Sequence, residues 1–157
     1  MVRRPSVILA LPLSIFLAFL MAALPLPQEL SYGRPEFVTM VLVFWVLNEP
    51  DKVGVWTALV LGLLLDVLMA TMFGVHPLML AVVAYLARLS YRWVTVFSVW
   101  QTGGLVFVLV LAGRLVKYML LGILGNGPDS LLYWVPALTS ALVWPTVMFF
   151  LRRFTRE

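Results

Sequence analysis

Apolar runs, separated by short charged or proline- and glycine-rich joints, occupy nearly all of this 157-residue chain. The chain is 63% hydrophobic with a mean hydropathy of +1.04, and only 11% of its residues are charged. A soluble domain of this length has too little interior to bury so much apolar surface. Long apolar runs with short joints are typical of proteins that cross a membrane repeatedly. We therefore expect one all-α integral membrane domain covering residues 1–157.

The apolar runs predict six membrane-spanning helices, with limits at the prolines, glycines and capping residues of the joints. The expected ranges are 6–25, 35–48, 53–72, 77–90, 96–124 and 136–151. The second range is short for a span, because about 13 residues make roughly 20 Å of helix and the hydrocarbon core is about 30 Å thick. A second segment that dips into the membrane and returns is the alternative to six spans.

The distribution of basic residues favours six spans, because cytoplasmic loops of membrane proteins are enriched in Lys and Arg. With a cytoplasmic N-terminus, six spans leave only Arg34 outside. The cytoplasmic side then holds Arg3, Arg4, Lys52, Arg88, Arg92, Arg152, Arg153 and Arg156. If the second segment re-enters, the cytoplasm keeps only Arg3 and Arg4. We therefore expect both termini in the cytoplasm. Arg3 and Arg4 before an apolar run also fit a secretory signal, which is the less favoured interpretation.

This topology accounts for the net charge of +4, so we do not expect nucleic acid as a partner. The chain has no cysteine, which excludes disulfides and thiolate metal sites. Its joints are too short for a nucleotide site, and it has no arrangement typical of nucleophilic, metal-dependent or paired-acid catalysis. We expect neither an enzyme nor a cofactor.

The run from Gly54 to Ala70 carries one acid among apolar residues. Residues four apart lie on one face of a helix. Here that face consists of Gly54, Ala58, Gly62, Asp66 and Ala70. Small residues let a neighbouring membrane helix approach closely. A carboxylate at membrane depth costs roughly 2.5–3.5 kcal/mol on insertion scales, so it should face protein or water. We predict a helix packed by its small face, with a buried Asp66 that needs a partner.

Two cations, Arg114 and Lys117, lie inside the fifth expected helix. Helix rise places them at about the depth of Asp66, in the outer half of the membrane. We predict an ion pair or network of Asp66 with Lys117, Arg114 or both. Three roles stay open. The one we favour is a structural lock between the helices at 53–72 and 96–124. The others are a polar cavity for a substrate, a proton or a lipid headgroup, and cations that reach lipid phosphates at the outer surface.

Three smaller features have plain structural interpretations. His76 is a single histidine beside Pro77, which suits a turn or cap residue and not a metal site. Tyr85 is predicted to be a core tyrosine. Ala18 and Ala22 form a small-xxx-small pair, a candidate docking face for a partner helix and a common pattern in alanine-rich sequences.

Several short motifs follow one another along the chain. They are Arg34-Pro35, Trp45-Val46-Leu47, Pro50, Gly54, Gly62, Leu65-Asp66, Gly74-Val75, Tyr85-Leu86 and Trp144-Pro145. In this order they resemble the MreD family of bacterial rod shape-determining proteins, over almost the whole chain and most sharply at residues 34–86. The pattern contains no catalytic signature. It marks Arg34, Pro35, Asp66 and Gly74 as family motif positions without giving any of them a role.

The resemblance implies a non-enzymatic subunit of the machinery that elongates rod-shaped cells. It implies the bacterial inner membrane as the location and MreC as a direct partner. The glycosyltransferase RodA, a class B penicillin-binding transpeptidase and the actin-like MreB belong to the same machinery. The family's fold is similar to the S components of energy-coupling-factor vitamin transporters. The leading interpretation is a scaffold that holds MreC and supports peptidoglycan synthesis.

Two other functions stay open. An S-component-like transporter subunit would bind a small vitamin or a metal, although the outer joints lack a set of polar groups to recognise one. A subunit that binds membrane lipids would use Arg114 and Lys117 to hold a headgroup.

Overall fold

The computed structural model describes residues 5–24, 36–49, 52–69, 74–94, 96–125 and 131–156. Within these ranges the chain forms seven α-helices and one short 3-10 helix. They are α1 (Pro5–Ala23), α3 (Phe37–Asn48), α4 (Val55–Met69), α5 (Val75–Leu89), α6 (Tyr91–Val94), α7 (Val99–Ile123), η1 (Leu131–Trp134) and α8 (Val135–Arg156). The expected all-α fold is confirmed for the described residues.

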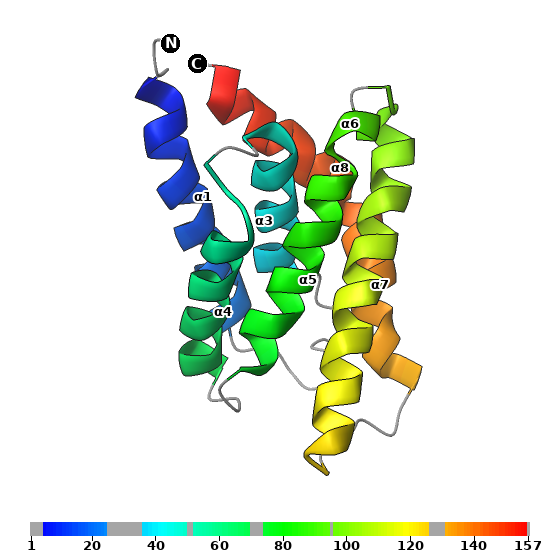
Figure 1. Ribbon diagram of the computed structural model, residues 1–157. Coiled ribbons are helices and arrows are strands. Elements are labelled where there is room, and N and C mark those ends of the chain that lie inside the picture. The colour runs from blue at the N-terminus through cyan, green and yellow to red at the C-terminus, as the bar shows by residue number, and fades with distance from the viewer. Residues whose placement is uncertain are drawn as a thin grey trace.

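The six longer helices form one bundle in which successive helices run in alternating directions (Figure 1). The start of α1 and the end of α8 therefore lie at the same end of the bundle, which we call the termini end. The end of α4 and the start of α5 lie at the other end, which we call the opposite end. The neighbouring pairs with the most extensive contacts are α4 with α5, α7 with α8 and α5 with α7.

Helix α3 is the centre of the bundle. It packs against α1, α5 and α8, and all residues from Val38 to Leu47 are buried. One hydrogen bond ties its inner surface to α1, because the Trp45 Nε1–H donates to Ser14 Oγ over 2.8 Å. A helix that is apolar on all sides is stable only where it is surrounded. The uniform apolarity of the second expected helix thus reflects burial by other helices.

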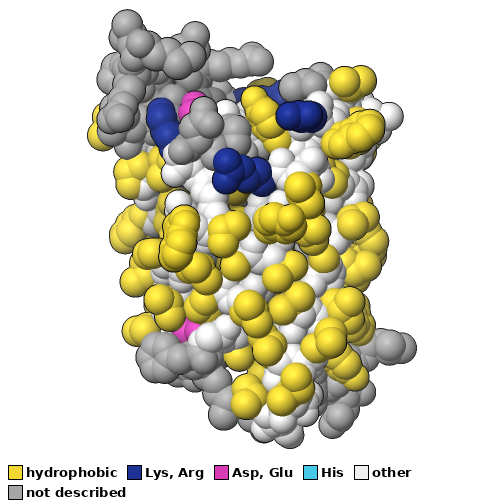
Figure 2. All heavy atoms as spheres, viewed as in Figure 1, with side chains coloured by type: hydrophobic (Ala, Val, Ile, Leu, Met, Phe, Trp, Pro, Cys, Tyr) yellow, Lys and Arg dark blue, Asp and Glu magenta, His cyan; other side chains and the backbone are white. Residues whose placement is uncertain are grey.

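The outer surface of the bundle is apolar. Large hydrophobic side chains such as Phe16 (60% exposed), Leu142 (69%) and Phe149 (71%) point away from the core. Figure 2 shows hydrophobic side chains over most of one face, with Lys and Arg gathered toward the termini end. Exposed apolar surface on this scale is not found on soluble monomers, so the protein is a helical membrane protein.

Two helical segments of the described chain are long and apolar enough to cross a membrane, Trp100–Ile123 in α7 and Val135–Arg153 in α8. The other apolar helices are shorter, from 10 to 17 residues by the same measure. Helix α3 has 12 residues, and α4 and α5 have 15 each.

Several details differ from the sequence expectations. Tyr85 is 56% exposed on the outside of α5, so its assignment to the core is wrong. Helix α8 continues to Arg156, beyond the expected end at residue 151. Helix α7 begins later than expected, because Ser98 and Gln101 form a capping box at its start. The residues Arg34, Pro35 and Ala70, named above, lie outside the described ranges.

Gly62 sets the distance between α4 and α5. A Cβ atom built on Gly62 would lie 2.7 Å from the carbonyl carbon of His76 and closer still to the backbone of Pro77. Backbone atoms at the start of a packed helix have little room to move. Only a residue without a side chain therefore permits this approach.

We expect Gly62→Ala to destabilise the bundle by about 1–3 kcal/mol, the usual cost of overpacking a rigid contact. Thermal unfolding of the purified protein in detergent measures the effect as a lower midpoint. Gly104→Ala is the matched control, because a Cβ there meets nothing within 4 Å. Equal midpoints for the two variants would contradict the close contact.

Candidate functional site

Five ionisable side chains from three helices and one helix-capping position gather toward the opposite end of the bundle. They are Glu36, Asp66, His76, Arg114 and Lys117. Glu36, His76, Arg114 and Lys117 line a cavity of about 180 Å³, with mostly apolar side chains around them. We call the five residues the polar cluster. Charged groups at this position in a membrane protein are costly, so each needs a compensating interaction.

Asp66 is buried and binds the start of the next helix. Its Oδ2 accepts a hydrogen bond from the backbone N–H of Gly74 at 2.9 Å. Its Oδ1 accepts one from the backbone N–H of His76 at 3.2 Å and lies 2.6 Å from His76 Nδ1. The carboxylate of α4 thus satisfies N–H groups that the first turn of α5 leaves without helical partners. Its negative charge also stabilises the positive end of the helix dipole.

Gly74 has the backbone conformation that this arrangement requires. It is the N-cap of α5, with φ at +105° in the left-handed region. Residues with a side chain rarely adopt this conformation, so glycine is strongly favoured. The eight-residue spacing from Asp66 to Gly74 therefore has a physical reason, since the turn returns the Gly74 N–H to the carboxylate.

Glu36 and Arg114 form the second ion pair of the cluster. Arg114 Nη1 donates to Glu36 Oε1, and both side chains are almost fully buried, at 10% and 13% exposure. Thr39 Oγ1 donates to Glu36 Oε2 at 3.1 Å. The Glu36 N–H donates to Ser140 Oγ on α8 at 2.9 Å. The start of α3 is therefore bound to both α7 and α8.

Arg114 also holds the segment that leads into α8. Its Nε–H donates to the carbonyl of Tyr133 at 2.7 Å, and its guanidinium carbon lies 4.2 Å from the centre of the Tyr133 ring. The Tyr133 hydroxyl in turn donates to the carbonyl of Arg114 at 2.8 Å. Burial raises the pKa of Tyr133 to about 12, so the hydroxyl keeps its proton at neutral pH. The Tyr118 ring packs beside the Tyr133 ring in a tilted arrangement, and the Trp134 ring meets the Tyr133 ring edge to face.

Lys117 is the member of the cluster without a direct partner in the part of the chain that the structure describes. It is half-buried one turn along α7 from Arg114 and lines the cavity. In the described ranges, neither Glu36 nor Asp66 forms an ion pair with its ammonium group. Lys117 thus supplies the cavity with a cation and hydrogen-bond donors.

The predicted ion pair of Asp66 with Lys117 or Arg114 is wrong in its pairs. Among the described residues, Asp66 forms no ion pair with Arg114 or Lys117. It binds His76, and Arg114 binds Glu36. The physical reason is local: the start of α5 follows α4 directly and presents two N–H groups and an imidazole to Asp66. The lock through Asp66 therefore joins α4 to α5, and not α4 to α7 as expected.

Two residues of this network were missed from the sequence. His76 is predicted to be a turn or cap residue; it lies buried in the first turn of α5, two residues after the N-cap Gly74, and contacts Asp66. Glu36, which the sequence analysis does not single out, is the N-cap of α3 and pairs with Arg114. The available signal for His76 was its position just after Gly74, across a short joint from Asp66. For Glu36, the signal was an acid at the start of an otherwise apolar helix.

The small residues named from the sequence occupy different environments. Ala58 is fully buried beside Gly62, on the side of α4 that packs on α5. Gly54 is half-buried, and a Cβ on it would lie 3.9 Å from Arg88 Nη1, an ordinary contact. Ala18 is buried on the floor of an apolar groove, whereas Ala22 lines the cavity of the polar cluster. Ala18 and Ala22 thus do not form one exposed face.

The chemistry of the cluster is that of ion pairs and hydrogen bonds. No group of three or more His, Asp or Glu side chains in the described ranges has the arrangement of a metal site. The carboxylates of Asp66 and Glu36 accept hydrogen bonds from protein donors. The arrangement locks α4 to α5 and α3 to α7.

Comparison with known proteins decides the family. Residues 3–154 match the family described as rod shape-determining protein MreD. The chain belongs to the MreD family. It is also 30% identical over 144 residues to a rod shape-determining protein MreD from Haemophilus influenzae (strain ATCC 51907 / DSM 11121 / KW20 / Rd). That alignment covers 90% of this chain and 87% of the relative. No solved structure matches the chain.

Membership of the MreD family confirms the resemblance inferred from the sequence motifs. It assigns the chain to the proteins that determine rod shape, which are not a known family of enzymes. The apolar helices fit the membrane association of MreD proteins. The Asp66–Gly74 hydrogen bond gives two of the motif positions a structural role in this member.

We expect Asp66→Ala to destabilise the protein more than His76→Ala. Asp66→Ala leaves two backbone N–H groups and an imidazole without their acceptor, whereas His76→Ala removes one interaction. Breaking a buried charged interaction costs roughly 3–5 kcal/mol. Unfolding in a mixed-micelle denaturant titration compares the two variants. A loss for His76→Ala equal to or larger than that for Asp66→Ala would contradict the capping role.

We also expect Glu36 and Arg114 to be energetically coupled. A double-mutant cycle with Glu36→Gln and Arg114→Gln should give a coupling free energy of about 1 kcal/mol or more. The exposed pair Glu49–Lys52, with 3.7 Å between its charged atoms, provides the control cycle. Exposed pairs contribute about 0.2–1 kcal/mol, so the control coupling should be the smaller one. Equal values would mean that burial adds nothing to the Glu36–Arg114 pair.

Proposed function

We propose that this protein is a non-catalytic scaffold of the cell-elongation machinery in the bacterial inner membrane. In this role it binds MreC and supports peptidoglycan synthesis by RodA and a class B penicillin-binding transpeptidase, with MreB as an indirect partner. The observation that carries the proposal is membership of the MreD family over residues 3–154. The ion-paired polar cluster supports it, because its groups hold helices together.

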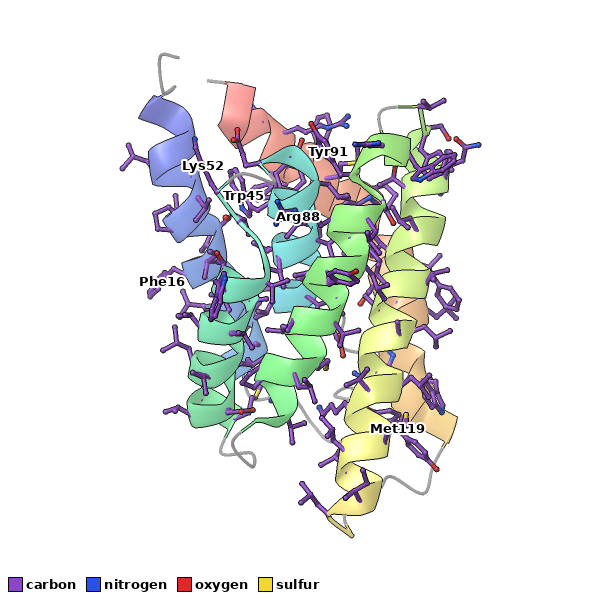
Figure 3. All side chains as sticks on the ribbon, in the orientation of Figure 1. Phe16, Trp45, Lys52, Arg88, Tyr91 and Met119 are labelled. Carbon is purple, nitrogen blue, oxygen red and sulfur yellow. The ribbon has the colours of Figure 1, made fainter. Side chains whose placement is uncertain are left out.

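The proposed topology has six spans with both termini in the cytoplasm. The alternating directions of the helices support it, as does the common end of α1 and α8. The exposed cations near the termini end support the orientation, since cytoplasmic surfaces are enriched in Lys and Arg. The labelled residues Lys52 and Arg88 lie near that end in Figure 3. In this topology the polar cluster faces the outer half of the membrane.

The proposed mechanism is docking of a partner membrane helix through small faces. The groove that contains Ala18 is a suitable surface. It is about 410 Å³ in volume and lies between α1, α3 and α8, with Leu13 and Leu17 on its rim. The lining is almost wholly apolar, so a membrane helix would fill it by van der Waals packing. We propose the membrane helix of MreC as its occupant.

A transporter S component is the less favoured function. The family match names a protein of rod shape, and the cavity of the polar cluster is only about 180 Å³, below the usual size of a small-molecule site. A stoichiometric vitamin in the purified protein, detected by mass spectrometry, would reverse this ranking.

We expect Leu13→Trp to reduce copurification of MreC, because the larger ring obstructs the groove. Leu13 is 49% exposed on the groove rim, and Leu63 on α4 is 48% exposed away from it. Leu63→Trp is therefore the matched control and should retain MreC. The assay is affinity purification of the tagged protein from membranes in mild detergent, with the MreC band quantified.

Growth provides the second part of this test. The wild-type chain and Leu63→Trp should restore rod shape in cells depleted of their own MreD, and Leu13→Trp should give rounded cells. Retention of MreC by Leu13→Trp would reject the groove as the docking surface. Failure of the wild-type chain to bind MreC in several detergents would reject the proposed function.

A further inference from the structure

A second polar surface lies at the termini end, away from the polar cluster. It is an open pocket of about 1030 Å³ where the end of α5, the short helix α6 and the start of α4 meet. Its lining includes the cations Arg88 and Arg92 and the aromatic residues Tyr85, Tyr91 and Trp93. We call these five residues the basic-aromatic pocket. None of these five residues takes part in the Asp66–His76 or Glu36–Arg114 pair that joins the helices.

Arg88 gives the pocket a positive charge that the described part of the chain does not neutralise. Arg88 forms no hydrogen bond or ion pair with any described residue. The carboxylate of Glu49, which precedes α4, already pairs with Lys52 at 3.7 Å. Arg88 and Arg92 are both exposed and four residues apart, on either side of the turn at Ser90. Two guanidinium groups in this arrangement suit a phosphate, which accepts several charge-assisted hydrogen bonds.

The aromatic side chains place the pocket at the boundary between lipid and water. Tyr91 is 41% exposed and Trp93 is 65% exposed, beside the two cations. Tyr and Trp are enriched at this depth because one end of the ring system is apolar and the other is polar. Arg88 and Tyr91 appear together near the termini end in Figure 3.

An apolar strip leads from the pocket toward the middle of the bundle. Leu89 (58% exposed), Tyr85 (56%) and Leu78 (46%) lie on the outward side of α5. Their spacings of four and seven residues put them on one face of the helix. An acyl chain attached to a group in the pocket would therefore lie along exposed apolar side chains. The charged side chains of an acidic protein segment would gain nothing from contact with this apolar strip.

We propose that the basic-aromatic pocket binds the phosphate-bearing headgroup of an anionic phospholipid, with an acyl chain along α5. Arg88 and Arg92 hold the phosphate, and Tyr91 and Trp93 surround the headgroup at the membrane boundary. Basic pockets between membrane helices on the cytoplasmic side bind anionic headgroups by this chemistry. The inference depends on the membrane location of the bundle and is independent of the proposed binding to MreC.

The test is native mass spectrometry of the full-length, delipidated protein titrated with phosphatidylglycerol or phosphatidylcholine. We expect the wild type to bind phosphatidylglycerol at least about fivefold more tightly than phosphatidylcholine. Arg88→Gln with Arg92→Gln should weaken phosphatidylglycerol binding roughly tenfold and leave phosphatidylcholine binding unchanged. Arg88→Lys with Arg92→Lys should retain most of the preference, because the charge is kept.

The matched control removes the same charge elsewhere at the termini end. Arg152 and Arg153 are exposed near the end of α8 and do not line the pocket. Arg152→Gln with Arg153→Gln should change phosphatidylglycerol binding less than about threefold, since neither residue lines the pocket. Gel filtration and thermal unfolding show whether each variant is folded before lipid is added.

Three results would overturn the proposal. One is equal affinity of the wild type for the two lipids. Another is an equal loss of phosphatidylglycerol binding in the Arg88/Arg92 and Arg152/Arg153 variants, which would reduce the effect to net charge. The third is a hexaglutamate peptide that binds the wild type more tightly than phosphatidylglycerol does and depends on Arg88 and Arg92. That result would make the pocket a site for an acidic protein segment.

Discussion

The structure depends on how a buried carboxylate is satisfied in an apolar bundle. An ionised Asp66 in hydrocarbon would be strongly unfavourable by itself. Here it accepts two backbone N–H groups from the first turn of α5 and contacts the His76 ring. The first turn of α5, in turn, would otherwise leave donors unsatisfied. Each partner thus removes the energetic cost of the other, and the contact specifies how α4 meets α5.

Two other features depend on this contact. Gly62 lies one turn before Asp66 and permits the backbone of Pro77 to approach α4. Gly74 supplies the left-handed turn that brings its own N–H to the carboxylate. The missing side chain at Gly62 and the carboxylate at Asp66 therefore both fix how closely α4 packs on the start of α5. Gly62, Asp66 and Gly74 act as one unit, although they are spread over 13 residues and two helices.

Much of the fold could be predicted because local rules decide it. Proline, glycine and the apolar runs gave helix limits close to those of α1, α3 and α5. The need of Asp66 for a partner followed from the physics of membrane burial. The identity of that partner could not be predicted in this way, because every residue except proline has a backbone N–H group and the sequence pattern does not show which one is free to donate. Estimates of depth in the membrane pointed to Arg114 and Lys117 on α7. Residues at equal depth can lie on neighbouring helices or on helices farther apart in the bundle, so depth alone does not identify the partner.

The central position of α3 also has a consequence for how the protein is made. At about 18 Å, α3 is too short to cross a hydrocarbon core of about 30 Å as an independent helix. Its surroundings include α5 and α8, and Glu36 at its start pairs with Arg114 on α7. All three of those helices are synthesised after α3. In the proposed six-span topology, stable insertion of α3 therefore has to wait for the C-terminal half of the chain, which makes insertion a cooperative event completed late in translation.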